Sequence, residues 1–307
     1  MVTCNICPIG CNFKEDNGKK KEGICRAILF TTGRGLEART IVFQYGYHRI
    51  EELGFYHFYP GAQVLYFLTP YCNLRCTFCS HAKFIFRTHS VMEGLSSLSD
   101  LEEIMNQSKE FGINAVVLSC NSGLFFPLVK KLKEEAVSKN LPLALITHGV
   151  YNEGYIKKVI GVVDAVLVIF FGFSKNSYAK LTIIPEGYKF SLKTLESALK
   201  ADKHTEVAYY VIPGINNKKD LEDFLKEIKE LFGVDIPVHF KRFQPGFLLK
   251  DRAPTRNKAL KKAYNLAKKM GFHYVYVDDF FEGLELSLIH ISEPTRPRLI
   301  SYAVFCL

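Results

Sequence analysis

The chain has 307 residues, of which 48% are hydrophobic and 23% charged, and its formal net charge at pH 7 is +9. This composition indicates a globular protein and excludes an intrinsically disordered one. The length suits one large α/β domain or two smaller ones. No apolar run reaches transmembrane length, and the start lacks the pattern of a signal peptide. The sequence therefore predicts a cytoplasmic protein that is not bound to a membrane.

Residues 1–60 are rich in cysteines and turns, and we predict that they form a separate N-terminal region. Cys4, Cys7, Cys11 and Cys25 follow one another at short spacings. In a reducing compartment, clustered cysteines hold a metal more often than they form disulfides. Four thiols suit either zinc or an iron–sulfur cluster. The sequence predicts a metal site here and leaves the identity of the metal open.

Residues 61–285 alternate between strand-like and helix-like segments. The predicted strands are 63–69, 114–120, 143–148, 164–171, 206–212, 237–243 and 272–277, and the predicted helices are 99–112, 126–139, 152–161, 191–200, 219–232 and 256–271. Repeated β-then-α order predicts an α/β fold with a parallel sheet and right-handed crossovers. About six such units predict a partial barrel, whose active site would lie at the carboxyl ends of the strands.

The segment YCNLRCTFC at residues 71–79 directly follows the first predicted strand of the barrel. It carries Cys72, Cys76 and Cys79, with Phe78 just before the last thiol. Thiolates are soft ligands that suit zinc or iron–sulfur clusters, but structural zinc sites take four ligands. Three cysteines on a cubane cluster would leave one iron open to an outside ligand. The sequence therefore predicts an iron–sulfur site at the active edge of the barrel.

This spacing, Cys72-x3-Cys76-x2-Cys79 with the aromatic Phe78, resembles the motif of the radical S-adenosylmethionine (SAM) enzymes. More closely, the chain is similar to the radical SAM enzyme of the AmmeMemoRadiSam system, in the wider group of pyruvate formate-lyase activating enzymes. The resemblance extends over nearly all of residues 4–278. It is carried by CNICPIGC and GICR near the start, IEELGFYHFYPG (50–61), VDA (163–165), VIPGINN (211–217), DIPVHFKRFQPGFLLKDRAPT (235–255) and GFHYVYV (271–277).

The resemblance implies that Cys72, Cys76 and Cys79 bind a 4Fe–4S cluster whose open iron is chelated by SAM. Reductive cleavage of SAM would then yield a 5′-deoxyadenosyl radical that takes a hydrogen atom from a substrate. That substrate would be a small molecule or a protein, the latter through formation of a glycyl radical. An acidic ferredoxin or flavodoxin would suit this basic protein as electron donor. The cofactor carries the difficult chemistry, and the barrel orients it.

Several positions depart from the family pattern. Asn121 is kept, but Ser122 stands where the family has a glutamate that helps to hold SAM. His148 replaces the asparagine of a Thr-Asn-Gly turn, and Ile169-Phe170-Phe171 replaces Asp-Leu-Lys. Either the enzyme has shifted to a less polar set of contacts, or the chain is a non-catalytic iron–sulfur protein on a degenerate scaffold. We favour retained catalysis, because an exposed three-thiolate cluster is a poor structural device.

Two further residues, His239 and Arg242, lie near the end of the strand 237–243 and are candidates to contact SAM or a substrate carboxylate. Alternation places them on opposite faces of the strand, so only one of them can point into the barrel. A nucleic-acid-binding protein, for example a zinc ribbon, would cluster its basic residues among exposed aromatics. Here the lysines are spread over helix faces, and we expect no nucleic-acid partner.

The last segment, residues 286–307, reads LSLIHISEPTRPRLISYAVFCL and shows neither helix nor strand periodicity. It resembles the translation of a sequencing-library adapter. We therefore expect that the natural sequence is cut off near Glu285 and exclude the segment from fold reasoning.

Overall fold

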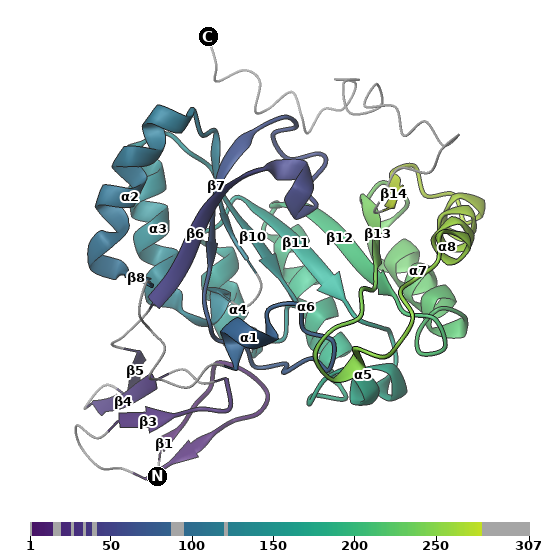
Figure 1. Cartoon of the computed structure of the whole chain (residues 1–307), viewed down its shortest axis with the longest axis horizontal. Helices are drawn as coiled ribbons and strands as arrows, with labels where there is room; N and C mark the ends of the chain where they lie inside the picture. Colours follow the sequence, from purple (N-terminus) through teal and green to yellow (C-terminus); the bar gives the residue numbers. More distant parts are fainter. Residues whose placement is uncertain are drawn as a thin grey trace.

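A nine-stranded sheet forms the centre of the protein (Figure 1), and its strands lie in the order β14-β13-β12-β11-β10-β9-β7-β6-β8. The computed structural model describes residues 2–14, 20–25, 28–32, 35–38, 42–86, 95–119 and 122–277. Neighbouring strands run parallel from β7 to β14: β7 (Gln63–Leu68), β9 (Ala115–Leu118), β10 (Leu143–Thr147), β11 (Ala165–Phe170), β12 (His204–Val211), β13 (Val238–Arg242) and β14 (Val275–Val277). β6 (Val42–Arg49) and β8 (Ser96–Ser97) extend the sheet antiparallel. Because β14 and β8 form its edges, the sheet is a partial barrel, as predicted.

Most of the helices cover the outer face of this sheet, whereas α1 and α5 lie near the carboxyl ends of its strands (Figure 1). The helices are α1 (Ala82–Ile85), α2 (Leu101–Gln107), α3 (Phe126–Ser138), α4 (Glu153–Ile160), α5 (Lys175–Leu181), α6 (Gly187–Lys200), α7 (Lys219–Phe232) and α8 (Asn257–Lys269). The helix α5 was not predicted, because seven residues are too few to establish a 3.6-residue pattern. Its start is marked by a capping box between Ser174 and Ser177. No helix among the described residues is long and apolar enough to cross a membrane.

The N-terminal segment forms small sheets of its own. β1 (Val2–Thr3) pairs with β2 (Asn12–Phe13), and β3 (Lys20–Glu22), β4 (Ile28–Thr32) and β5 (Gly35–Ala38) form an antiparallel sheet. β6, which also lies within residues 1–60, pairs with β7 in the main sheet instead. A separate region that ends at residue 60 stays a prediction. The adapter-like tail, residues 286–307, lies outside the described residues.

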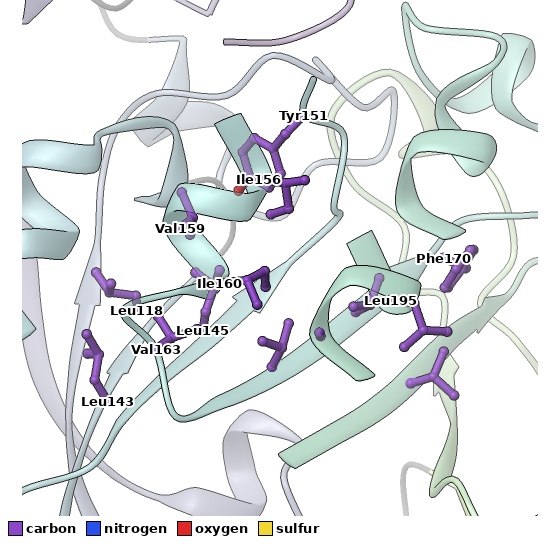
Figure 2. Packing of buried hydrophobic residues seen from close by; sticks show 14 of the residues in the cluster. Leu118, Leu143, Leu145, Tyr151, Ile156, Val159, Ile160, Val163, Phe170 and Leu195 are labelled. Atoms are coloured by element: carbon purple, nitrogen blue, oxygen red, sulfur yellow. The ribbon is translucent and has the colours of Figure 1, made fainter. Parts of the chain in front are cut away.

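Alternation along each parallel strand separates two apolar layers. On β10, Leu143 and Leu145 face outward, where they pack with residues of α4 such as Ile156 and Val159 (Figure 2). Ala144 and its neighbours in the inner layer face the interior of the barrel. Because both faces are buried, the strand reads as a continuous apolar run rather than an alternating one, as expected for a parallel sheet covered on both faces.

The inner layer contains small side chains on four strands, namely Ala115, Ala144, Ala165 and Ala208, which face the interior of the barrel. The space that they leave is filled by the segment 50–62, whose Ile50, Phe55 and Phe58 pack against them. This segment turns back on itself, since the Ile50 N–H donates to the Ala62 carbonyl at 3.0 Å. The family-like stretch IEELGFYHFYPG therefore fills part of the barrel interior.

The turn after β10 is packed tightly onto α6, and this can be measured with two alanine substitutions. Gly149 and Gly112 both have left-handed backbone, with φ of 70° and 60°. A Cβ on Gly149 would lie 2.9 Å from Thr194 Cβ, whereas a Cβ on Gly112 would meet nothing within 4 Å. We expect Gly112→Ala to lower the free energy of unfolding by about 1 kcal/mol and Gly149→Ala by about 2–4 kcal/mol. Equal losses in urea denaturation would contradict the tight packing.

Candidate functional site

The barrel cysteine loop, residues 71–79, lies just past the carboxyl end of β7. Cys72 and Cys76 are buried, Cys79 is partly exposed, and none of the three forms a disulfide with another described residue. Neighbouring loops hold its backbone: the Thr77 N–H donates to the Leu181 carbonyl at 2.9 Å, and the Leu248 N–H donates to the Thr77 carbonyl at 2.8 Å. The loop that carries the thiols is thus fixed from two sides.

Phe78 inserts into an aromatic cluster beneath this loop. Its ring centroid lies 5.0 Å from Phe171, in an edge-to-face arrangement, 5.7 Å from Phe243 and 5.8 Å from Tyr210. Such pairs stabilise beyond the apolar area that they bury. The cluster packs with Cys72 and Cys76, so the surroundings of the buried thiols are largely apolar.

His148 follows β10 at the same edge of the sheet, with its ring 4.8 Å from that of Phe171. The side chain is only 7% exposed, and its Nδ1 atom has no hydrogen-bond partner among the described residues. Burial lowers the pKa of this imidazole to about 3, so the ring is neutral at physiological pH. A buried, neutral nitrogen with no partner is an unusual feature in a folded protein.

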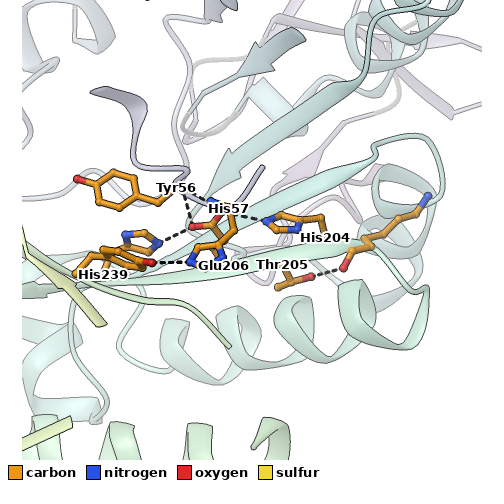
Figure 3. Close-up of polar contacts among 8 residues, drawn as sticks. Tyr56, His57, His204, Thr205, Glu206 and His239 are labelled. Atoms are coloured by element: carbon orange, nitrogen blue, oxygen red, sulfur yellow. Dashed lines mark hydrogen bonds and ion pairs between the residues drawn. The ribbon is translucent and has the colours of Figure 1, made fainter. Parts of the chain in front are cut away.

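His239 lies elsewhere, in a polar cluster around Glu206 (Figure 3). Its Nε2 atom is 2.6 Å from Glu206 Oε2, and His204 Nε2 is 3.0 Å from Oε1 of the same carboxylate. The backbone N–H groups of Tyr56 and His57 also donate to Glu206. Because Glu206 is near the amino end of β12 and the barrel cysteine loop follows the carboxyl end of β7, the structure does not bring His239 together with the thiols.

This cluster also contains the residue that sequence reasoning missed. Glu206 is fully buried, and burial alone would raise the pKa of its carboxyl group. Hydrogen bonds from His204 and His239 outweigh burial and hold that pKa well below its usual range. The signal in the sequence was a single carboxylate inside an otherwise apolar strand.

The remaining predicted residues are distributed as follows. The Arg242 guanidinium donates to the Thr255 carbonyl and, at 2.6 Å, to Asn257 Oδ1, so the loop before α8 occupies it. Ser122 begins a 3-10 helix, η5 (Ser122–Leu124), after β9. Asn121 lies outside the described residues.

The four N-terminal cysteines line one pocket, here called the N-terminal cysteine pocket. Its lining residues are Cys4, Ile6, Cys7, Cys11, Gly23, Ile24, Cys25 and Leu124. A Cβ on Gly23 would lie 3.5 Å from Cys25 Sγ and 3.8 Å from Cys11 Sγ, so glycine keeps the space between these two thiols open. Burial raises the pKa values of Cys4 and Cys7, while backbone N–H groups two residues further along, those of Ile6 and Ile9, donate to the two sulfurs.

Among the described residues, no three Cys, His, Asp or Glu side chains already form a group that could hold a metal ion. The fit of a metal therefore rests on the donor chemistry. The barrel cysteine loop offers three thiols, and the N-terminal cysteine pocket is lined by four more. Both sets suit soft metals such as iron in iron–sulfur clusters, and the second also suits zinc.

Comparison with known proteins assigns the class. The sequence model of the Radical SAM superfamily matches residues 66–228, which include Cys72, Cys76 and Cys79. This chain belongs to the radical SAM superfamily. The family implies a 4Fe–4S cluster and SAM as cofactors, and the chemistry of SAM cleavage.

A relative and two solved structures are also similar to this chain. An uncharacterized protein of Methanocaldococcus jannaschii is 26% identical over 286 residues, which cover 90% of this chain and 80% of that protein. A radical SAM methyltransferase from Sphaerobacter thermophilus has a TM-score of 0.51 at 12% identity, over 81% of this chain and 72% of that one. The FeFe-hydrogenase maturase HydG from Carboxydothermus hydrogenoformans has a TM-score of 0.51 at 13% identity, over 74% and 56%. At such identities these structures show the common fold.

The buried state of His148 predicts a pH dependence of stability. The unfolded chain binds a proton at this histidine below about pH 6.5, whereas the folded chain binds it only near pH 3. Between these values the free energy of unfolding should fall by about 1.4 kcal/mol for each unit by which the pH decreases. We expect the free energy of unfolding of the wild type minus that of His148→Leu to decrease with this slope as the pH falls below 6.5. Parallel stability curves in urea denaturation would refute the buried, neutral state.

Proposed function

We propose that this protein is a radical SAM enzyme in which Cys72, Cys76 and Cys79 hold a 4Fe–4S cluster with one iron open to SAM. The observation that carries the proposal is the position of three thiols, two of them buried, on one loop at the carboxyl edge of the sheet, inside the region that matches the superfamily. In α/β barrels this edge is where ligands bind.

When bound, the cluster and SAM would supply a 5′-deoxyadenosyl radical for hydrogen abstraction from a substrate. The residues of the chain would hold the cofactors and exclude water. Phe78 and Phe171 supply apolar walls, and the neutral ring of His148 offers one nitrogen for a hydrogen bond to a cofactor or substrate. Where the family pattern has an aspartate and a lysine, Ile169 and Phe171 leave the rim without those charges. This favours a site that makes fewer ionic contacts with its ligands.

The finer assignment rests on resemblance. The stretches shared with the enzyme of the AmmeMemoRadiSam system and with pyruvate formate-lyase activating enzymes support a related reaction, such as glycyl-radical formation or the activation of a small molecule. Members of the superfamily take electrons from ferredoxin or flavodoxin, and the net charge of +9 suits an acidic donor. Candidate contacts to SAM are Asn121, Ser122 and His148. The partners of His239 and Arg242 favour structural roles for these two residues.

A second candidate function is that of a non-catalytic iron–sulfur protein on the same scaffold. It is favoured by Ser122 and Phe171, which replace two charged residues of the family pattern. The two functions differ in whether SAM is cleaved.

The deciding measurement is SAM cleavage by the full chain, purified without oxygen and reduced. If the enzyme is active, we expect 5′-deoxyadenosine to form and Cys76→Ser to abolish it together with the iron signal, because two thiolates cannot hold the cluster in place of three. The matched control is Ser80→Ala, a change of the exposed residue that follows the loop directly, and this variant should retain both. Bound iron without any 5′-deoxyadenosine would favour the non-catalytic candidate.

We also propose that the N-terminal cysteine pocket binds a second metal, either zinc or an iron–sulfur cluster. Support comes from the four thiols around one pocket and from the backbone N–H groups that donate to Cys4 and Cys7. Such donors stabilise metal-bound thiolates. If the pocket binds metal, Cys4→Ser with Cys11→Ser should remove one site's complement of zinc or iron in elemental analysis. The iron held by the barrel cysteine loop should remain. Unchanged metal content would refute the second site.

A further inference from the structure

We infer that the N-terminal cysteine pocket positions the backbone of the proposed SAM site, and we call this role the clamp. Asn73 and Asn152 are the positioning residues that connect the pocket to the site. The inference rests on the proposed function, because it concerns the rim at which SAM would bind. It arises from contacts that join the pocket to three successive strand ends, those of β7, β9 and β10.

The first contact reaches the barrel cysteine loop itself. The Cys72 N–H donates to the Cys25 carbonyl at 3.2 Å, so a residue of the pocket holds the backbone of the first barrel thiol. The neighbouring Asn73 is fully buried, and its side chain donates to the Val150 carbonyl at 2.8 Å and hydrogen-bonds the Cys7 thiol. Cys72 and Asn73 are thereby tied to the pocket on one side and to the turn after β10 on the other.

The second contact involves Asn152, the N-cap residue of α4. An N-cap asparagine ordinarily accepts hydrogen bonds from the first turn of its helix, but this side chain makes no such bond. Its Nδ2 atom donates instead to the carbonyls of Asn5, at 3.0 Å, and Cys7, at 3.2 Å. Its backbone N–H donates to the Ile6 carbonyl at 3.0 Å. Asn152 thus hydrogen-bonds the carbonyls of three successive residues, 5–7, in the segment that carries Cys4 and Cys7. Its side chain does not cap α4.

The third contact lies at the end of β9. Leu124, which closes the 3-10 helix begun by Ser122, lines the pocket. The Leu124 carbonyl accepts a hydrogen bond from the Tyr155 hydroxyl of α4 at 2.6 Å. The same α4 that carries Asn152 therefore also holds the segment that contains Ser122.

Each contact falls within a few residues of a proposed ligand of the cluster or of SAM: Asn73 beside Cys72, which would bind the cluster, Leu124 near Ser122, and Asn152 near His148. In most of them at least one partner is a backbone group, so the contacts fix the path of the chain. Hydrogen-bonded supports of this kind hold binding groups within the narrow tolerance that a site requires. The pocket is therefore placed to set the geometry of the rim.

The test uses Asn152→Asp in the full chain. Aspartate has the size of asparagine and caps helices as well, so α4 should be at least as stable. It cannot donate to the carbonyls of Asn5 and Cys7, and its charge repels them. The matched control is Asn5→Ser, because the exposed Asn5 side chain is not required for the bond that its backbone carbonyl accepts.

Two readouts separate the clamp from the proposed function. Hydrogen exchange of the peptide that covers residues 71–79 requires neither cluster nor SAM, and we expect it to be at least tenfold faster in Asn152→Asp than in the wild type or Asn5→Ser. In reconstituted protein with unchanged iron content and melting temperature, we expect at least tenfold weaker SAM binding by calorimetry and an altered electron paramagnetic resonance spectrum of the reduced cluster with SAM.

The clamp would be overturned if Asn152→Asp showed the same hydrogen exchange of the peptide 71–79 and the same SAM affinity as Asn5→Ser. Faster exchange together with wild-type SAM binding would overturn its role at the SAM site. If the wild type binds no SAM although its cluster is present, the proposed function fails, and exchange still reports whether the pocket holds the loop. A merely structural role for Asn152 would lower the melting temperature and leave the spectrum of the intact cluster unchanged.

Discussion

Four alanines on the inner face of the sheet determine where this protein can bind a ligand. Because Ala115, Ala144, Ala165 and Ala208 leave space, the segment 50–62 can fill the interior with Ile50, Phe55 and Phe58. Glu206 then fixes this segment by accepting the backbone N–H groups of Tyr56 and His57. The interior near the amino ends of the strands is thereby packed, and the carboxyl edge, with its thiols, is left for chemistry.

Polarity is distributed unevenly within the barrel as a consequence. The ionised carboxylate of Glu206 lies beside the segment 50–62, which fills the barrel interior. Hydrogen bonds with His204 and His239 compensate the burial of this carboxylate. The rim that carries the thiols is aromatic, and its histidine is neutral. Electrostatic interactions are stronger in such surroundings than in water. A charged sulfonium such as SAM would therefore depend on the thiolate-bound cluster for electrostatic compensation more than on charged side chains.

The sequence predicted the parallel sheet, most of its helices and the cysteine loop, since these follow from periodicity and from spacing within short segments. The boundaries of α2, α6 and β14 differ from the prediction, and α1 and α5 were missed because they are short. The Glu206 cluster could not be predicted, because the backbone N–H groups that Glu206 accepts belong to a segment about 150 residues earlier in the chain. The role of Asn152 was hidden for a related reason: its sequence position predicts a helix cap, and only the tertiary structure shows that the side chain is used elsewhere.

The bond between Asn5 and Asn152 closes a loop of 147 residues. The entropic cost of closing a loop rises with its length, so contacts between residues this far apart are expected to follow local ones in folding. The N-terminal cysteine pocket would then dock after the barrel strands have assembled. Until it docks, the Cys72 N–H would not be held by the Cys25 carbonyl, and the barrel thiols would be more accessible to an incoming cluster. Such an order of folding would leave a period in which the cofactor could enter before the loop is fixed.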